Sequence, residues 1–140
     1  DLIKAYNKRL FSGNIREEMA FGQHWSAWEN ALASIASDGI SARAPADYAR
    51  TFARLENHYF INNGFLDDKD AILSNMEKIE DIPGNIVQGR FDMICPPTSA
   101  FKLFEKLPNA KIKIVPQAGH AMSEPGISSE LVQITNELVS

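Results

Sequence analysis

An aspartate and a histidine follow two strand-like segments of this 140-residue chain, each near the point where the segment ends. Asp92 comes shortly after Gly89, which closes the first segment, and His120 follows Gly119 after the second. Catalytic groups of open α/β sheets collect at the carboxyl ends of the strands. A carboxylate there can fix the tautomer of an imidazole and stabilise the imidazolium that forms when it accepts a proton from a hydroxyl nucleophile. The two residues therefore indicate a general base and its acid partner.

The order of the two residues along the chain adds to this interpretation. The interval between Asp92 and His120 holds one predicted helix, one predicted strand and two loops, which can bring the side chains together. An acid that precedes the histidine also matches a triad order in which serine comes first. On spacing alone, structural roles for both residues stay open, because aspartates often cap loops.

The third member of such a triad is not found in the sequence. It would be a serine on a Gly-x-Ser-x-Gly turn, which presents the hydroxyl beside the oxyanion donors, and no such pattern occurs. Ser12 precedes Gly13 but lacks the glycine on its N-terminal side. Cys95 is the other candidate, yet a thiol so close to Asp92 is discouraged from ionising, and a small residue in the loop is the simpler interpretation. We expect the nucleophile to lie outside this chain.

Helices are predicted to fill residues 1 to about 78. Apolar side chains recur there at spacings of three and four residues, which is typical of amphipathic helices. Examples are Phe21, Trp25, Trp28, Leu32 and Ile35. A second helix is predicted over 45–59, with Pro45 in its first turn. Its apolar face is Tyr48, Phe52, Leu55 and Tyr59. The acidic run 67–70 predicts the start of a third helix that reaches toward Ile79.

Beyond the turn at 82–84 the pattern changes to alternating strands and helices. We predict strands over 85–89 and 111–116, with a helix over 98–106 between them. A last helix is predicted over about 128–138, with Ser128 as its N-cap. This order gives a right-handed βαβ unit with a parallel strand pair.

Two features lead us to expect further sequence upstream of Asp1. Two parallel strands alone leave their faces uncovered, so more strands should precede them. The chain also opens directly on a helical pattern, without an initiator methionine.

The composition is that of an ordinary globular domain, with 44% hydrophobic and 23% charged residues. The net charge of -4 and the scattered basic residues argue against a nucleic-acid partner. A single cysteine excludes an internal disulfide, and neither a signal peptide nor a transmembrane pattern is recognised. We therefore expect a cytoplasmic protein without a membrane partner. His24 and His58 lack a paired His or Cys motif, so we assign them structural or surface roles and predict no metal or cofactor.

Several strings of the sequence carry a more specific signal. They are Trp25-Ser26-Ala27-Trp28-Glu29, Arg54-Leu55-Glu56-Asn57-His58-Tyr59-Phe60, Ile82-Pro83-Gly84, Gly89-Arg90-Phe91-Asp92-Met93-Ile94-Cys95-Pro96, and Ala118-Gly119-His120 with Glu124-Pro125. Together they resemble the proline iminopeptidases, or prolyl aminopeptidases, which are serine peptidases of the α/β-hydrolase superfamily. The resemblance runs through nearly the whole chain, in the family's order, and covers the family's C-terminal part. The Glu-Asn-His-Tyr-Phe and Asp-x-x-Cys-Pro strings are specific to the family, whereas Gly-His is common in the superfamily.

The resemblance implies a fold class and a domain organisation. The chain is expected to be an α/β, C-terminal fragment of an α/β-hydrolase, in which a helical cap segment precedes the last two parallel strands and helices. Residues 1–80 would form the helical cap, incomplete at its N-terminal side. Residues 81–140 would form the C-terminal βαβα part of the core.

The resemblance also implies roles for four residues. Asp92 is the triad acid and His120 the general base, while Glu29 and Glu56 in the cap hold the free amino terminus of the substrate. Physical chemistry agrees, because an N-terminal proline carries an ammonium on an apolar ring and needs carboxylates beside aromatic surface. Each glutamate lies one helical turn from an aromatic residue. Without the resemblance, a solvated helix surface stays the alternative for both glutamates.

Two positions depart from the family's pattern. Gln88 stands where the family often has histidine, and Ala121 stands where it commonly has serine. Neither is a triad member, so the departures bear on the finer substrate preference.

The leading hypothesis is that the whole protein releases N-terminal proline from small peptides through an acyl-enzyme. This chain would supply Asp92, His120 and half of the pocket. We expect the chain alone to be inactive and to self-associate through uncovered strand edges. Two alternatives stay open: another capped α/β-hydrolase, such as an esterase or epoxide hydrolase, and a non-catalytic helical interaction domain.

Overall fold

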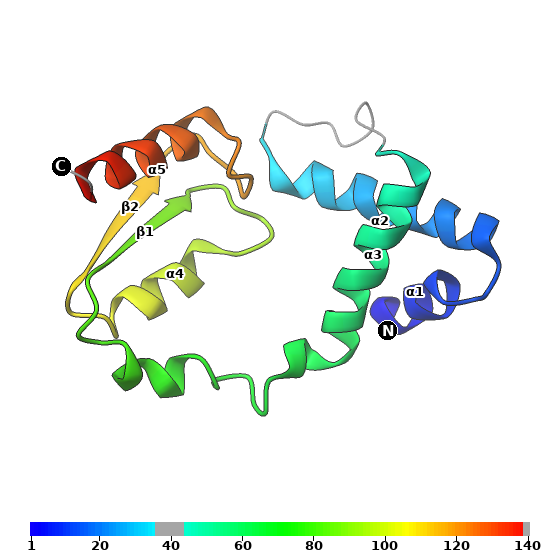
Figure 1. Ribbon diagram of the computed structural model, residues 1–140, viewed down its shortest axis with the longest axis horizontal. Helices are drawn as coiled ribbons and strands as arrows, with labels where there is room; N and C mark the ends of the chain where they lie inside the picture. The colour runs from blue at the N-terminus through cyan, green and yellow to red at the C-terminus, as the bar shows by residue number, and fades with distance from the viewer. Residues whose placement is uncertain (36–43, 139–140) are drawn as a thin grey trace. The chain divides into compact units, whose positions relative to one another are not determined.

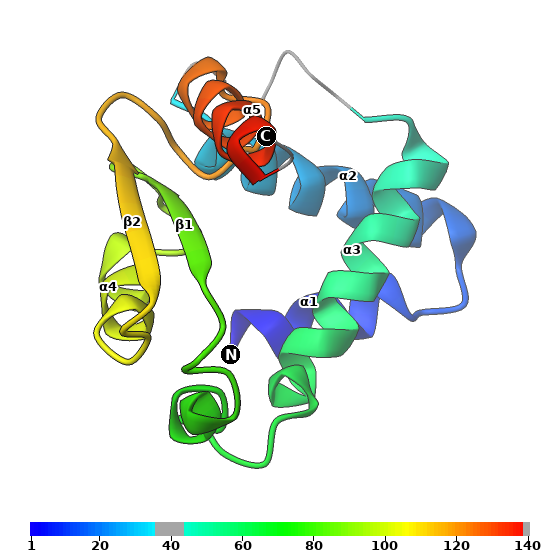
Figure 2. The same ribbon diagram turned by 60° about the vertical axis from the view of Figure 1, so that its left-hand side comes forward.

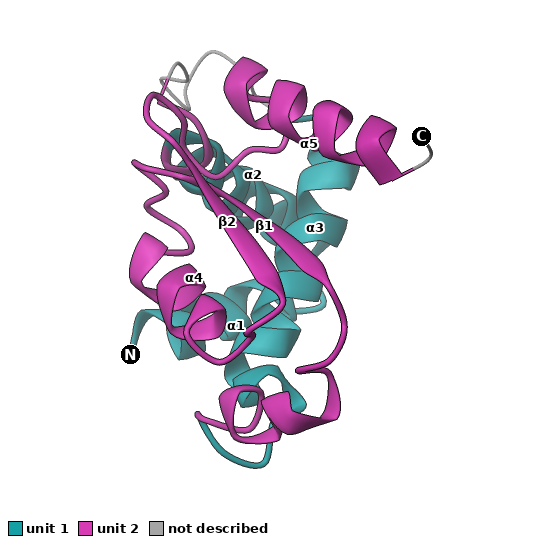
Figure 3. Cartoon of the chain, turned by 90° about the vertical axis from the view of Figure 1, so that its left-hand side faces the viewer, with its two compact units in different colours: residues 1–31, 37–69 teal, residues 32–36, 70–140 magenta. Residues whose placement is uncertain are grey.

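The computed structural model describes residues 1–35 and 44–138. The chain divides into two compact units, of which unit 1 contains residues 1–31 and 37–69 and unit 2 contains residues 32–36 and 70–140 (Figure 3). Helices make up unit 1, and unit 2 combines two strands with helices, as Figure 1 shows. The prediction of a mixed α/β chain, with a helical segment followed by two parallel strands and helices, is confirmed.

The described residues of unit 1 form three α-helices. They are α1 (Leu2–Leu10), α2 (Ile15–Ala33), whose last two residues belong to unit 2, and α3 (Ala46–Ile61), and a short 3-10 turn, η1 (Asn63–Phe65), follows them. The side chain of Asp1 caps α1 by accepting a hydrogen bond from the backbone N–H of Ile3. The core of the unit is a cluster of buried residues with partly buried apolar neighbours. Its members are Leu10, Trp25 and Ala53, with Ile3, Tyr6, Phe21 and Phe52 packed against them.

The buried face of α3 differs from the predicted one. Ala49 and Ala53 are buried, whereas Tyr48 and Leu55 are 62% and 59% exposed. The reason lies in α2, where Gly22 lies so close to α3 that an added Cβ would be 2.7 Å from the Cα of Arg50. Two helices that approach this closely need small residues at the crossing, so Tyr48 and Leu55 do not occupy it, whereas Phe52 packs against the core.

Unit 2 contains a two-stranded parallel sheet and the helices around it. In chain order its elements are a 3-10 segment, η2 (Leu73–Lys78), then β1 (Gly84–Gly89), α4 (Pro97–Phe104), β2 (Ala110–Val115) and α5 (Pro125–Leu138). The two strands pair in parallel from Gly84 with Ala110 to Gly89 with Val115. Helices α4 and α5 lie on opposite sides of the strands (Figures 1 and 2). Because β1 and β2 pair in parallel, their carboxyl ends lie at the same edge of the sheet.

The core of unit 2 lies between the strands and α5. Val115, Ala118 and Ile127 are buried together, and Val87 and Leu131 pack against them. This cluster fixes the chain just after β2 against the start of α5.

Two predicted elements are wrong in detail. The third helix, expected from 67–70 toward Ile79, is only the 3-10 segment η2, which Asn75 interrupts with a non-helical φ of -117°. The last helix begins at Pro125, and Ser128 is not its N-cap, because the backbone N–H of Ser128 already donates to the carbonyl of Glu124. The proline starts this helix earlier, since its fixed φ suits the first helical position.

Among the described residues, no helix combines the length and the apolar character that crossing a membrane requires.

Candidate active site

Asp92 lies in a tight loop directly after β1. The loop is held to the end of β2 and to the segment after it, because Arg90 N–H donates to the Val115 carbonyl and Phe91 N–H to the Ala118 carbonyl, both at 2.9 Å. The side chain then folds back on its own loop, and Oδ1 accepts hydrogen bonds from the backbone N–H groups of Ile94 at 3.0 Å and Cys95 at 2.7 Å. Aspartate favours such local turns because its short side chain reaches backbone donors a few residues on.

The second carboxylate oxygen of Asp92 faces His120. Its Oδ2 lies 3.0 Å from Nδ1 of His120 and accepts a further hydrogen bond of 3.0 Å from Nε2 of Gln88. The structure thus brings together the two residues that the sequence places after neighbouring strands. The side chain of Asp92 is 6% exposed and that of His120 is 40% exposed. A buried, fully hydrogen-bonded acid therefore holds an imidazole that reaches solvent.

The electrostatics of this pair favour an ionised acid. Burial of the carboxyl raises the pKa of Asp92, but hydrogen bonds from the Cys95 N–H, His120 and Gln88, and the charge of a protonated His120, outweigh it. The pKa of Asp92 is therefore below its ordinary value of 3.8. An acid that stays ionised can orient the imidazole and stabilise its protonated form.

The end of β1 and the backbone just before His120 approach each other too closely for a side chain at Gly89. A Cβ on Gly89 would lie 1.9 Å from the Gly119 carbonyl oxygen, so only glycine fits at the end of β1. The N–H groups of His120 and Ala121 both donate to the carbonyl of Ala33, at 2.8 and 2.7 Å. The loop that carries the imidazole is thus fixed on two sides within unit 2.

Glu29 and Glu56, the predicted substrate-binding acids, lie in unit 1. Glu56 is half-buried in α3, and its Oε2 accepts a hydrogen bond of 2.7 Å from the indole N–H of Trp25 in α2. Glu29 is half-buried in α2, one turn beyond Trp25. An acid held by an indole beside aromatic rings suits an ammonium group on an apolar ring. The roles of the two glutamates in binding a substrate stay predictions.

The other candidate residues have structural contacts. Ser12 accepts a hydrogen bond from the N–H of Asn14 in the turn between α1 and α2. His24 lies edge-on to Phe21, and His58 packs against the ring of Phe65.

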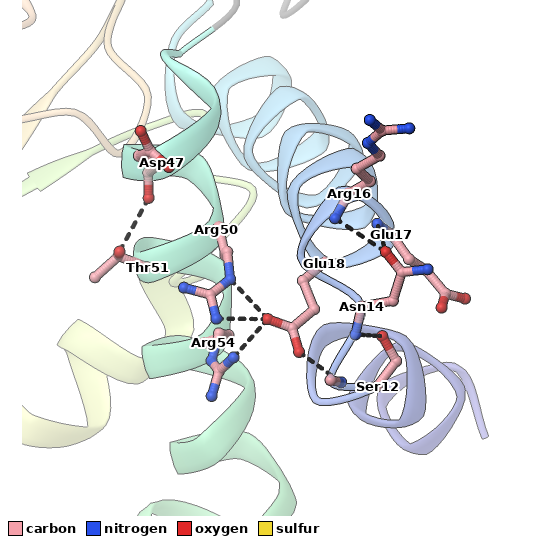
Figure 4. Close-up of polar contacts among 10 residues, drawn as sticks. Ser12, Asn14, Arg16, Glu17, Glu18, Asp47, Arg50, Thr51 and Arg54 are labelled. Atoms are coloured by element: carbon pink, nitrogen blue, oxygen red, sulfur yellow. Dashed lines mark hydrogen bonds and ion pairs between the residues drawn. The ribbon is translucent and has the colours of Figure 1, made fainter.

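Unit 1 contains an ion cluster of Glu18, Arg50 and Arg54 that is not predicted from the sequence (Figure 4). Glu18 is 3% exposed, and its Oε2 accepts hydrogen bonds of 2.7 Å from both Arg50 and Arg54 of α3. Its Oε1 accepts one of 2.9 Å from the N–H of Gly13. The Gly13 hydrogen bond first, and then Arg50, hold the pKa of Glu18 below its ordinary value of 4.5. In the sequence, Arg50 and Arg54 are one helical turn apart, which predicts that they lie on the same face of a helix. This spacing does not predict that Glu18 of another helix binds them both.

Two polar residues near Asp92 and His120 are not predicted from the sequence as parts of the candidate site. Gln88 was noted only as a departure from the family pattern, and Glu124 only as part of a string. Gln88 contacts Asp92 directly, and Glu124, which is 6% exposed, contacts the backbone of Ile35. A polar residue in the turn before a helix was the only signal for Glu124.

Comparison with known proteins gives a consistent result. No family model matches the chain. The chain is 42% identical over 142 residues to a probable proline iminopeptidase of Leptolyngbya boryana. It is 40% identical over 141 residues to a proline iminopeptidase of Xylella fastidiosa and 42% identical over 138 residues to one of Arabidopsis thaliana. The resemblance to this family is thereby confirmed.

The alignments cover the chain almost completely and the relatives only in part. They include 100%, 99% and 97% of this chain, but 44%, 45% and 36% of the three relatives. The chain spans less than half the length of the relatives it matches.

Proposed function

We propose that this chain, which is related over its whole length to part of the proline iminopeptidases, supplies the acid and the general base of a serine exopeptidase that releases N-terminal proline. The observation that carries the proposal is the 3.0 Å contact between Oδ2 of Asp92 and Nδ1 of His120 at the carboxyl ends of two parallel strands. In this proposal the chain is the C-terminal part of an α/β-hydrolase. Residues 1–80 belong to its helical cap, and residues 81–140 belong to the C-terminal βαβα part of its core.

The chemistry follows from the orientation of His120. With Nδ1 hydrogen-bonded to Asp92, Nε2 accepts the proton of a serine hydroxyl while the serine oxygen bonds to the carbonyl carbon of the prolyl residue. The imidazolium then gives that proton to the amine of the departing peptide, and the acyl-enzyme remains. Water, deprotonated by the same imidazole, hydrolyses the ester and releases proline. The serine and the oxyanion donors come from the part of the enzyme that precedes this chain in sequence.

The glutamates of unit 1 explain selectivity for a free amino terminus. Glu56 and Glu29 pair with the secondary ammonium of the N-terminal proline, and the aromatic rings of the same helices pack its apolar ring. A peptide without a free amino terminus at this position cannot form these charge-assisted ion pairs. The proposed substrates are small peptides with an N-terminal proline.

The decisive experiment measures proline release from prolyl peptides by the complete protein and its variants. Asp92→Asn and His120→Ala should each lower kcat by roughly a thousandfold or more. His24→Ala is a matched control, because this histidine is exposed and lies edge-on to Phe21 in unit 1. Full activity of either triad variant would refute the proposed roles.

A further variant separates the peptidase from other capped hydrolases. Glu56→Gln removes the charge but keeps the shape of the side chain. A peptidase loses turnover of prolyl substrates and retains turnover of a neutral ester, whereas an esterase or epoxide hydrolase shows no such difference. A purely structural domain hydrolyses neither substrate.

A further inference from the structure

Glu124 is a buried carboxylate that the proposed chemistry does not use. It is 6% exposed, and its Oε1 accepts a hydrogen bond of 3.1 Å from the backbone N–H of Ile35, a residue far away in sequence. Burying a carboxylate is costly unless its hydrogen bonds compensate for the lost water. The backbone groups of Glu124 have hydrogen-bond partners nearby in sequence. Its N–H donates to the Ala121 carbonyl, and its carbonyl accepts from the backbone N–H of Ser128.

The residues that Glu124 contacts adjoin the end of α2. The last carbonyl groups of a helix have no partner within the helix and need donors from elsewhere. The carbonyl of Ala33 accepts two hydrogen bonds, from the backbone N–H groups of His120 at 2.8 Å and Ala121 at 2.7 Å. The backbone of the imidazole-bearing residue is therefore held by Ala33, two residues before the N–H that Glu124 holds.

Gly119 shows how closely these groups meet. A Cβ at this position would lie 3.0 Å from the Ala33 carbonyl oxygen and 3.3 Å from Oε1 of Glu124. The C-terminal end of α2 and the carboxylate of Glu124 thus both lie next to the backbone of Gly119, immediately before His120. All of these residues belong to unit 2.

We propose that Glu124 is a positioning residue for His120, because its carboxylate anchors residues 33–35, whose carbonyl at Ala33 fixes the backbone of the base. This proposal deepens the proposed function and rests on it for its catalytic consequence. Without the anchor the chain after α2 moves, the Ala33 carbonyl no longer holds its two donors, and the imidazole loses its position against Asp92. A displacement of a catalytic group by about 1 Å is enough to cost roughly a hundredfold in rate.

The test compares Glu124→Ala with Glu124→Gln in the complete protein. The amide oxygen of glutamine still accepts from Ile35, so Glu124→Gln should keep the contact that Glu124→Ala removes. Hydrogen exchange of the amides of Ile35, His120 and Ala121 should accelerate in Glu124→Ala and stay near wild type in Glu124→Gln. Glu130→Ala is the matched control, since this glutamate of α5 pairs with the exposed Lys113 and should leave the three amides unchanged.

Kinetics give the second readout. Glu124→Ala should lower kcat for prolyl peptides by roughly 10- to 100-fold with little change in KM, and Glu124→Gln should restore kcat. Unchanged exchange of the three amides in Glu124→Ala would overturn the proposal, and so would equal kcat losses in both variants. Exchange does not depend on activity, so a wild-type protein that releases no proline refutes the proposed function and leaves the anchor to be judged by exchange alone.

Discussion

The side-chain amide of Gln88 donates a hydrogen bond of 3.0 Å to Oδ2 of Asp92, the same carboxylate oxygen that contacts His120. The same amide nitrogen lies 3.1 Å from the carbonyl of Cys95. Gln88 therefore joins the end of β1 to the loop that carries the acid. It also supplies a neutral donor to a buried charge, which favours the ionised carboxyl.

Replacing Gln88 tests how much this donor contributes. Gln88→Leu keeps most of the volume and removes the hydrogen bonds, so it should lower the free energy of unfolding by about 1–3 kcal/mol. Proline release by the complete protein should fall roughly tenfold, because the carboxylate loses one of the groups that fix it. Urea unfolding and steady-state kinetics check the two effects. Gln133→Leu is the control, since Gln133 is exposed on α5 and donates a hydrogen bond to Glu137, four residues further along the same helix; equal losses in both variants would contradict the assignment.

The lowered pKa of Asp92 predicts a pH dependence of stability. A carboxyl whose pKa is lower in the folded state than in the unfolded state stabilises the fold above its ordinary value of 3.8, and this stabilisation disappears as the pH falls through the lower folded value. The difference in unfolding free energy between wild type and Asp92→Asn should therefore be constant near neutral pH and shrink below about pH 4. Urea unfolding across this range measures it. A difference that stays constant below about pH 4 would contradict the lowered pKa of Asp92.

The sequence predicts the closeness of Asp92 and His120 well, because parallel pairing of the two strands determines where the loops that follow them meet. Both strands are observed within one residue of their predicted bounds, and parallel pairing brings the residues after them to one edge. The contacts of Asp92 with Gln88 and with two backbone N–H groups depend on the path of the loop. No periodicity in the sequence encodes that path.

Helix packing in unit 1 was harder to predict. The spacing of Tyr48 and Leu55 marks an apolar face, but hydrophobicity does not tell which face a neighbouring helix covers. That choice depends on Gly22, whose missing side chain lets α2 approach α3 so closely that Ala49 and Ala53 become the buried residues. The buried face of α3 is thus determined by small residues on both helices, Gly22 on α2 and Ala49 and Ala53 on α3. The apolar face of a single helix does not reveal this match.

The hydrogen bond between Trp25 and Glu56 predicts an effect on substrate affinity. Trp25→Phe keeps an aromatic ring in the core and removes the indole N–H that holds the Glu56 carboxylate at 2.7 Å. We expect KM for prolyl peptides to rise roughly tenfold while kcat changes less, because a less ordered carboxylate binds the ammonium more weakly. Trp28→Phe, at a position that is 57% exposed, is the control. If both variants raise KM equally, the positioning role of Trp25 is wrong.

The Glu18 cluster predicts a loss of stability without a direct effect on the chemistry. Glu18→Ala leaves Arg50 and Arg54 without the carboxylate that both contact and leaves the Gly13 N–H without its acceptor. The melting temperature should fall clearly, because breaking a buried ion cluster on one side leaves uncompensated charges. Glu17→Ala is the neighbouring control, because its partner Arg9 is 58% exposed and such surface pairs contribute little. Equal melting temperatures of the two variants would show that the cluster is not a stabilising one.

The close approach of α2 and α3 predicts that Gly22 tolerates no side chain. Its added Cβ would lie 2.7 Å from the Cα and 2.8 Å from the N of Arg50, and backbone atoms cannot rotate away as the end of a side chain can. Gly22→Ala should therefore force the helices apart and lower the free energy of unfolding by about 1–3 kcal/mol, although alanine favours a helix over glycine. Gly84→Ala is the matched control, because nothing lies within 4 Å of its added Cβ. Urea unfolding decides between the two influences: a stability gain in Gly22→Ala would mean that helix propensity dominates and that the crossing is looser than the structure places it.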